Sequence, residues 1–173
     1  MKRSASARFL DRSMKKNKLS PESVLFQWNF YERTIANYSI IMKIFQYVED
    51  KESLIAYMPK VFVEETDFDM CQIIRNGKGE PQEGFFTIDD SLKSFTLEET
   101  EHLNRALFSP CLLSNVSGYG TLYIYPLSQD VDIFGYLILG KKEAIQLDEH
   151  ILRELELLCQ VLNKSMLLNI SID

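Results

Sequence analysis

Histidine and cysteine are scarce in this chain, which has two histidines and three cysteines among 173 residues. His102 and His150 lie far apart, and neither has the i, i+4 partner or the Cys-x-x-Cys neighbour that a tetrahedral metal site needs. We therefore expect no metal ion and no cofactor. Cys71, Cys111 and Cys159 are widely spaced, and three cysteines cannot all pair with one another. They predict free thiols and a reducing, cytoplasmic location.

Long hydrophobic runs are also missing, although 46% of the residues are hydrophobic and 25% are charged. Residues 106–129 carry no charge, but serine, proline, asparagine and glycine interrupt them, and a bilayer would leave their polar groups unsatisfied. The N-terminus lacks the apolar run of a secretory signal. We therefore expect no membrane partner. At this length a folded chain buries roughly 70% of its unfolded surface, which is enough for one core and one domain.

Positive charge is concentrated at the N-terminus. Residues 1–18 carry seven lysines or arginines against Asp11, a net charge of +6, which leaves −12 for the rest of a chain whose total is −6. An acidic domain repels phosphate, and Phe9 is the only aromatic residue of this arm, so the pattern disfavours nucleic-acid binding. We interpret residues 1–19 as a basic, flexible lead-in and residues 20–173 as one domain.

A long helix is predicted from Pro21, because Ser20 can cap it and proline suits the first helical position. Large apolar residues then recur in alternating steps of four and three, the 3.5-residue period of helices that pack against other helices. Further apolar residues lie off this row, so we expect the helix to touch the sheet as well. We call the row the N-terminal seam: Val24, Trp28, Tyr31, Ile35, Tyr38, Met42 and Phe45.

A second helix and a hairpin are predicted next. Residues 51–65 have helical apolar spacing, and Pro59 should kink or split this helix because it removes a backbone hydrogen bond. Residues 68–75 and 83–88 have strand character, and the Asn-Gly-Lys-Gly stretch at 76–79 suits the turn of a hairpin between them.

The middle of the chain predicts a small helix followed by a loop. Thr96 and Glu99 have the spacing of a capping box, which predicts a short helix to about Phe108. Residues 111–120 contain two glycines and few charges, so we expect a loop that lies over the protein surface.

Two strands and a last helix complete the pattern. Residues 121–127 and 133–140 are apolar on alternate and intervening positions alike, which is typical of strands covered by helices on both faces. The order of elements predicts a single α+β domain with a mainly antiparallel central sheet. The last helix begins at about Asp148, and its apolar row is the C-terminal seam: Leu152, Leu155, Cys159, Leu162 and Met166.

The last third of the chain carries a motif of a known family. Residues 125–127, Tyr-Pro-Leu, are followed by residues 132–140, Asp-Ile-Phe-Gly-Tyr-Leu-Ile-Leu-Gly, and by residues 147–149, Leu-Asp-Glu, at the start of a leucine-rich helix. This order resembles the GAF domain family, in which a Pro-Leu strand precedes a Phe-Gly-x-Leu-x-Leu-Gly strand, a polar loop and a capped helix. The resemblance covers about residues 22–170. PAS domains are a minor alternative, because they share the sensing role but lack the glycine-flanked strand.

The resemblance implies a GAF-like α+β fold with a central antiparallel sheet of about five or six strands. Long N-terminal and C-terminal helices would cover one face, and a small helix with loops would roof a pocket on the other. The alternative is that the residues under the roof fill a closed core. The candidate ligand-binding residues under the roof are Cys111, Ser114, Asn115, Tyr123 and Tyr125.

The resemblance also implies that the terminal helices dimerise and pass signals to attached output domains. The two seams could then form a parallel or a four-helix homodimer. The alternative is that each seam is buried within the monomer. The predicted dimer interface consists of Trp28, Tyr31, Ile35, Tyr38, Met42, Phe45, Leu155, Cys159, Leu162 and Met166.

Catalytic and nucleotide-binding motifs are missing: there is no Gly-x-Gly-x-x-Gly, no phosphate loop and no Gly-x-Ser-x-Gly. Some GAF proteins reduce free methionine sulfoxide with thiols, and these reductases carry a cysteine shortly before a strand that contains a glutamate. Here the corresponding strand, residues 121–127, contains no glutamate, and the eight positions before it contain no cysteine. The Asn-Lys-x-Phe-Asp-Glu signature of cyclic-nucleotide binders is absent, and His102 has no neighbouring cysteine that could attach a bilin.

We therefore predict a non-catalytic, cytoplasmic sensory or regulatory domain. It would bind a small, mostly uncharged molecule and signal through its terminal helices as a homodimer, with a signalling protein as a further partner. The alternative is a ligand-free dimerisation or protein-interaction module. A third and weaker alternative is a free methionine sulfoxide reductase.

Overall fold

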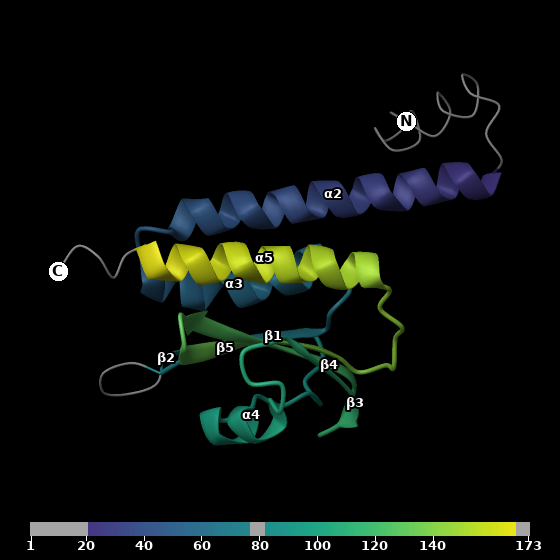
Figure 1. The fold of residues 1–173 in the computed structure, drawn as a ribbon. Helices are drawn as coiled ribbons and strands as arrows, with labels where there is room; N and C mark the ends of the chain where they lie inside the picture. Colours follow the sequence, from purple (N-terminus) through teal and green to yellow (C-terminus); the bar gives the residue numbers. More distant parts are fainter. Residues whose placement is uncertain (1–20, 77–81, 169–173) are drawn as a thin grey trace. The chain divides into compact units, whose positions relative to one another are not determined.

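The computed structural model describes residues 21–76 and 82–168, with side chains for residues 32–76 and 83–168. The predicted lead-in at 1–19 lies outside the described residues. The chain divides into two compact units, Met1–Tyr38 and Ser39–Asp173. The boundary between them falls within the first described helix. The helices are α2 (Pro21–Tyr47), α3 (Lys51–Glu65), α4 (Leu97–Leu103) and α5 (Glu149–Leu168), and the strands are β1 (Met70–Arg75), β2 (Gln82–Thr87), β3 (Cys111–Val116), β4 (Tyr119–Gln129) and β5 (Asp132–Lys141) (Figure 1).

The five strands form one sheet in the order β2-β1-β5-β4-β3, and every neighbouring pair is antiparallel. The hairpins β1–β2 and β4–β5 lie where the strand-forming and turn-forming residues predict them. β5 then pairs with β1 and joins the two hairpins into one sheet. The predicted α+β fold with an antiparallel central sheet is confirmed.

Strand β3 occupies residues for which the sequence predicted a loop. Cys111–Val116 pairs with β4 through a two-residue turn, in which Ser117 has a φ of 52° and Gly118 a φ of 86°. Two left-handed residues in succession give the turn whose twist matches that of a β-hairpin. The Ser-Gly pair was therefore the signal for a hairpin, and the prediction of a loop was wrong.

Helix α4 is shorter than predicted and ends at Leu103 instead of about Phe108. Its capping box is present: Thr96 Oγ1 accepts a hydrogen bond from the Glu99 amide, and a Glu99 carboxylate oxygen accepts one from the Thr96 amide. Asn104 ends the helix, and its Nδ2 donates to the Leu107 carbonyl oxygen at 2.8 Å in the turn that follows.

Helix α3 stays a single helix although Pro59 lies within it. Proline has no N–H group for the Ile55 carbonyl, and this carbonyl faces Gly84 of β2. A Cβ atom on Gly84 would lie 1.9 Å from the Ile55 oxygen, so a side chain at this position would push the helix away. The proline and the glycine together allow α3 to lie against the strand.

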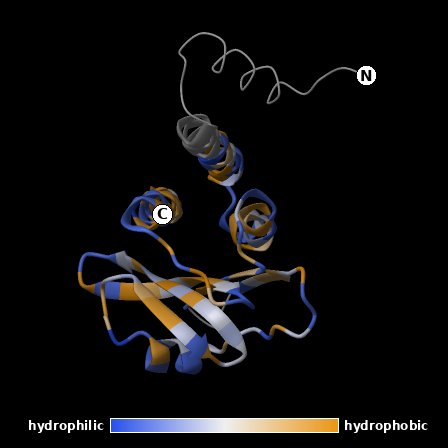
Figure 2. Cartoon of the chain, turned by 90° about the vertical axis from the view of Figure 1, so that its right-hand side faces the viewer, coloured by the Kyte–Doolittle hydropathy of each residue, from blue (hydrophilic) through white to orange (hydrophobic). Residues whose placement is uncertain are grey.

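Helices cover both faces of the sheet (Figure 2). α3 and α5 lie on one face, where the sequence predicted the first and last helices, and α4 lies on the opposite face. The end of α2 contributes Ile40 and Ile44 to the core on the α3 and α5 face. Strand residues that face this side include Cys71, Ile73, Tyr123, Tyr125, Leu127, Leu137 and Leu139, whereas Met70, Ile74, Leu122, Ile124, Tyr136 and Ile138 face α4.

Candidate functional sites

The sheet face under α4 is where the sequence placed a ligand pocket. Gln72 lies in β1 on this face with 0% of its surface exposed. Its Nε2 donates to the Phe95 carbonyl oxygen at 2.8 Å, and its Oε1 accepts from the Phe95 amide at 2.8 Å. Because both backbone groups of Phe95 are bonded, the segment before α4 is fixed against strand β1.

Apolar side chains fill the rest of this face. Tyr119 packs against Phe95 with ring centroids 5.4 Å apart, and its hydroxyl donates to the Lys93 carbonyl oxygen at 2.6 Å. Leu122, Ile124 and Ile138 have no exposed surface. The described residues therefore form a closed core here, which is the alternative that the sequence left open.

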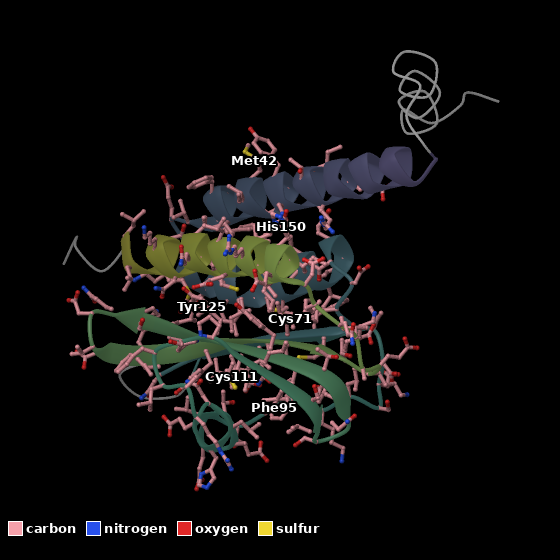
Figure 3. All side chains as sticks on the ribbon, turned by 45° about the vertical axis from the view of Figure 1, so that its right-hand side comes forward. Met42, Cys71, Phe95, Cys111, Tyr125 and His150 are labelled. Carbon is pink, nitrogen blue, oxygen red and sulfur yellow. The ribbon has the colours of Figure 1, made fainter. Side chains whose placement is uncertain are left out.

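The five predicted ligand-binding residues are not brought together. Cys111 faces α4, and its Sγ lies 4.0 Å from the Leu103 carbonyl oxygen. Ser114 and Asn115 are exposed near the end of β3, at the edge of the sheet. Tyr123 and Tyr125 pack in the core on the side of α3 and α5. Figure 3 shows Tyr125 between α5 and the sheet, so these tyrosines are not part of a floor under α4. Burial raises the pKa of Tyr125 to about 12 and raises that of Tyr123 still further.

The three thiols are separated by the sheet. Cys71 and Cys159 are fully buried on the α3 and α5 face, and burial raises the pKa of each well above its ordinary value. Cys111 lies on the opposite face, and partial burial raises its pKa as well. Thiol chemistry needs a thiolate beside a resolving partner, and this arrangement supplies neither to Cys111.

The described part of the N-terminal seam is exposed. Ile35, Tyr38, Met42 and Phe45 keep between 52% and 66% of their surface accessible. Figure 3 shows Met42 directed away from the sheet. The side chains of Val24, Trp28 and Tyr31 lie outside the described residues. Since Ile40 and Ile44 of the same helix are fully buried, α2 has one apolar face in the core and another without cover in the described chain.

The C-terminal seam has the opposite surroundings. Leu155, Cys159, Leu162 and Met166 are at most 5% exposed and pack in the core between α5 and the sheet. Side chains that are already buried in the monomer have little surface to offer a second copy. These four residues are therefore core residues instead of the interface residues that the sequence predicted.

A hollow of about 580 Å³ lies beside the start of β1 and the end of β5, where sequence reasoning placed no site. Its polar groups bond to one another: Lys142 Nζ forms an ion pair with Asp89 Oδ2 at 3.0 Å, and the Lys142 backbone amide donates to Asp69 Oδ2 at 3.0 Å. Hydrogen bonds from Ser91 and the ammonium of Lys142 lower the pKa of Asp89 to about 2. Its residues come from three separate segments, so no local motif indicates it: Asp69, Ile88, Asp89, Asp90, Ser91, Lys141, Lys142 and Glu143.

Among the described residues, no group of three or more histidine, cysteine, aspartate or glutamate side chains is arranged to hold a metal ion. No helix in the described ranges has the length and apolar character needed to cross a membrane.

Solved structures with this architecture are GAF domains. No protein-family model and no curated protein matches the sequence. A GAF domain assigned to a sensor histidine kinase of Pseudomonas syringae pv. tomato is 17% identical with a TM-score of 0.59, and the match covers 83% of this chain and 95% of that one. The phycoerythrobilin-bound GAF domain of a cyanobacterial phytochrome is 11% identical with a TM-score of 0.61, covering 79% and 97%.

An enzyme is among the similar structures. Free methionine-R-sulfoxide reductase from Neisseria meningitidis, in complex with its substrate, is 14% identical with a TM-score of 0.57, and the match covers 77% of this chain and 89% of the reductase. Likeness at this level of identity defines the fold alone. The chain therefore has a GAF-like fold, as its sequence motif predicted.

Proposed function

We propose that this chain is a non-catalytic, regulatory GAF-like domain that works as a ligand-free homodimerisation module. The exposed N-terminal seam carries the proposal. Its residues have the 3.5-residue period that suits pairing with another helix, and those with described side chains are more than half exposed. Exposed apolar rows of this kind mark interaction surfaces. A second copy supplies a helix of the same period, and the sensory GAF domains with the same fold support a regulatory role.

Mass measurement on charge variants tests the proposal. In the double variant Ile35→Glu/Met42→Glu, four carboxylates would enter the seam of a dimer, so we expect sedimentation velocity to show a monomer where the unchanged chain shows a dimer. Val131→Glu is the matched control, because Val131 is 75% exposed in the turn between β4 and β5 and is not part of the N-terminal seam. Circular dichroism checks that all three proteins fold. A folded double variant with an unchanged dimer mass would overturn the proposal.

Small-molecule binding, which the sequence analysis placed first, has less support. Two hydrogen bonds hold the Phe95 backbone against Gln72, and buried side chains of β4 and β5 fill the space beside them. The sheet face under α4 is therefore closed in the described conformation. Native mass spectrometry of the purified protein is expected to find no retained small molecule. A molecule released on denaturation, with protection of residues under α4, would restore the sensor hypothesis.

Reductase activity has the least support. The thiol on the α4 face has no second cysteine beside it, because Cys71 and Cys159 lie across the sheet. Methionine sulfoxide offered with a thiol donor should therefore give no turnover above that of the Cys111→Ser variant. We also infer a reducing, cytoplasmic location, because all three cysteines are free thiols.

A further inference from the structure

Strand β3 forms one edge of the sheet, and β2 forms the other (Figure 1). An open edge presents unpaired backbone N–H and C=O groups to any strand that approaches it, and proteins protect such edges with charged residues, proline or bulges. β2 carries Glu83, whereas β3, with the sequence Cys-Leu-Leu-Ser-Asn-Val, contains no charged residue and no proline. β3 is therefore the less protected of the two edges.

Hydrogen bonds on β4 show which residues of that strand face β3. The Ser128 N–H donates to Asn163 Oδ1 at 3.1 Å, and the Ser128 carbonyl oxygen accepts from Asn163 Nδ2 at 2.9 Å, so these groups point away from β5. The backbone direction alternates along an antiparallel strand. Pro126, Ile124 and Leu122 therefore face the same way as Ser128, toward the β3 side of β4.

On β3 the outward backbone groups belong to Leu112 and Ser114. Cys111 and Leu113 lie opposite the β4 residues that face β3, so these two residues bond to β4. Leu112 and Ser114 alternate with them, and their N–H and C=O groups point away from the sheet. Asn115 follows with a φ of 54°, which ends the extended run.

A second copy of β3 can pair with all of these outward groups. If two copies pair antiparallel about a two-fold axis at Leu113, Leu112 of each copy lies opposite Ser114 of the other. Opposite residues whose groups point toward one another exchange both of their backbone hydrogen bonds, so none of these donors and acceptors is left unpaired. An axis at Leu112 would place Ser114 opposite Pro110, which has no N–H for the Ser114 carbonyl oxygen. The axis at Leu113 is therefore the better register.

Charge favours a second copy of this chain as the partner strand. Residues 106–129, which include β3 and β4, carry no charge, whereas the net charge of residues 19–173 is −12. Two copies of an acidic domain approach without contact between like charges only at an uncharged surface. A basic partner would be attracted to the acidic surfaces instead. The pair would also cover Leu112, which is 43% exposed in the monomer.

We infer that β3 is a second self-association site, at which two copies join antiparallel about Leu113 and extend the five-stranded sheet of one chain into that of the other. This site goes beyond the proposed seam dimer and does not depend on it. Two such short strands bury far less than the roughly 1,200 Å² of a stable interface, so the contact should form only at higher protein concentration than the seam dimer. Together the two sites would join dimers into larger assemblies.

Variants of β3 test the site in the background Ile35→Glu/Met42→Glu, in which the seam is blocked. Ser114→Pro removes an outward N–H, which an edge strand tolerates, so the dissociation constant from sedimentation equilibrium at high protein concentration should rise about tenfold. Leu112→Lys should weaken association as well, because lysine protects edges. Phe85→Lys is the matched control on β2, since Phe85 is 39% exposed, and circular dichroism checks that each variant folds. Association that only Phe85→Lys weakens would overturn the inference.

Hydrogen exchange measured by mass spectrometry provides a second test that needs no change in β3. In the same background, the amides of residues 111–116 should exchange at least about threefold more slowly at high than at low protein concentration, while those of residues 83–87 stay unchanged. Equal exchange of residues 111–116 at all concentrations would overturn the β3 site. It would leave the seam proposal intact, because the mass of the unchanged chain at low concentration decides that proposal.

Discussion

The seams of α2 and α5 have the same alternating apolar spacing, yet the described part of the α2 seam is exposed and the α5 seam is largely buried. On α5 the seam itself meets the sheet, and Leu162 has no exposed surface. On α2 a different row meets the core, formed by Ile40 and Ile44, and the seam residue Met42 is 52% exposed. The period of a helix therefore identifies which residues share a face. Which of its apolar faces enters the core depends on the elements packed against it.

The largest difference between the seams should appear when one apolar side chain is shortened on each. Leu162→Ala leaves a cavity in the core and should lower the free energy of unfolding by about 2–5 kcal/mol. Met42→Ala, at an exposed position, should change it by at most about 0.5 kcal/mol at protein concentrations where the chain is monomeric. Chemical denaturation followed by circular dichroism measures both. Equal losses would show that the two seams have similar surroundings.

Alkaline pH should destabilise the fold through the buried thiol of the C-terminal seam, Cys159, whereas the N-terminal seam contains no thiol. Burial raises the pKa of Cys159 in the folded chain, whereas an unfolded cysteine has a pKa of about 8.5. This stabilisation is complete below about pH 8.5 and is lost as the pH rises further, because only the unfolded thiol ionises. The slope is at most about 1.4 kcal/mol per pH unit for each such thiol.

The control for this pH dependence compares a removed thiol with an added one. Cys159→Ala should make the fall in stability between pH 8.5 and 10 less steep. Met42→Cys adds an exposed thiol whose pKa should stay ordinary in the folded state, so it should leave the slope unchanged. Denaturation midpoints measured at several pH values test both variants. A steeper slope for Met42→Cys would contradict the contrast between the two seams.

The smallest effect concerns two tyrosines on opposite faces of β4. Tyr119 donates a hydrogen bond to the Lys93 carbonyl oxygen, so Tyr119→Phe should cost about 0.5–1.5 kcal/mol. The Tyr123 hydroxyl is buried under α5 without a hydrogen-bond partner among the described residues, so Tyr123→Phe should be neutral or slightly stabilising. Thermal unfolding of the two variants provides the comparison. A larger loss for Tyr123→Phe would indicate a partner for that hydroxyl.

Most elements of the fold were predictable because short-range chemistry defines them. Pro21 marks the start of α2, and Thr96 with Glu99 caps α4. β3 was missed because it has few charges and precedes two glycines, a composition that also suits loops. Its pairing with β4 is what makes this uncharged segment a strand.

The candidate sites were less predictable, because the faces of a doubly covered strand look alike in sequence. Tyr123 and Ile124 are neighbours in β4, and both are buried, at 2% and 0% exposure. No polar alternation shows which of them faces α4, so Tyr123 and Tyr125 were assigned to the wrong face. The hollow beside Lys142 was missed because Asp69 and Asp89 reach it from distant segments.

The close approach of the Ile55 carbonyl to Gly84 leaves no room for a side chain between α3 and β2. The end of α2 is tied to the same helix, since Tyr47 stacks on Tyr57 with ring centroids 5.2 Å apart and Ser39 Oγ donates to Glu65 at 3.3 Å. The last turns of α2 and the outer strand β2 thus contact the same helix, so a displacement of α2 relative to the sheet would have to change the packing of α3 on β2.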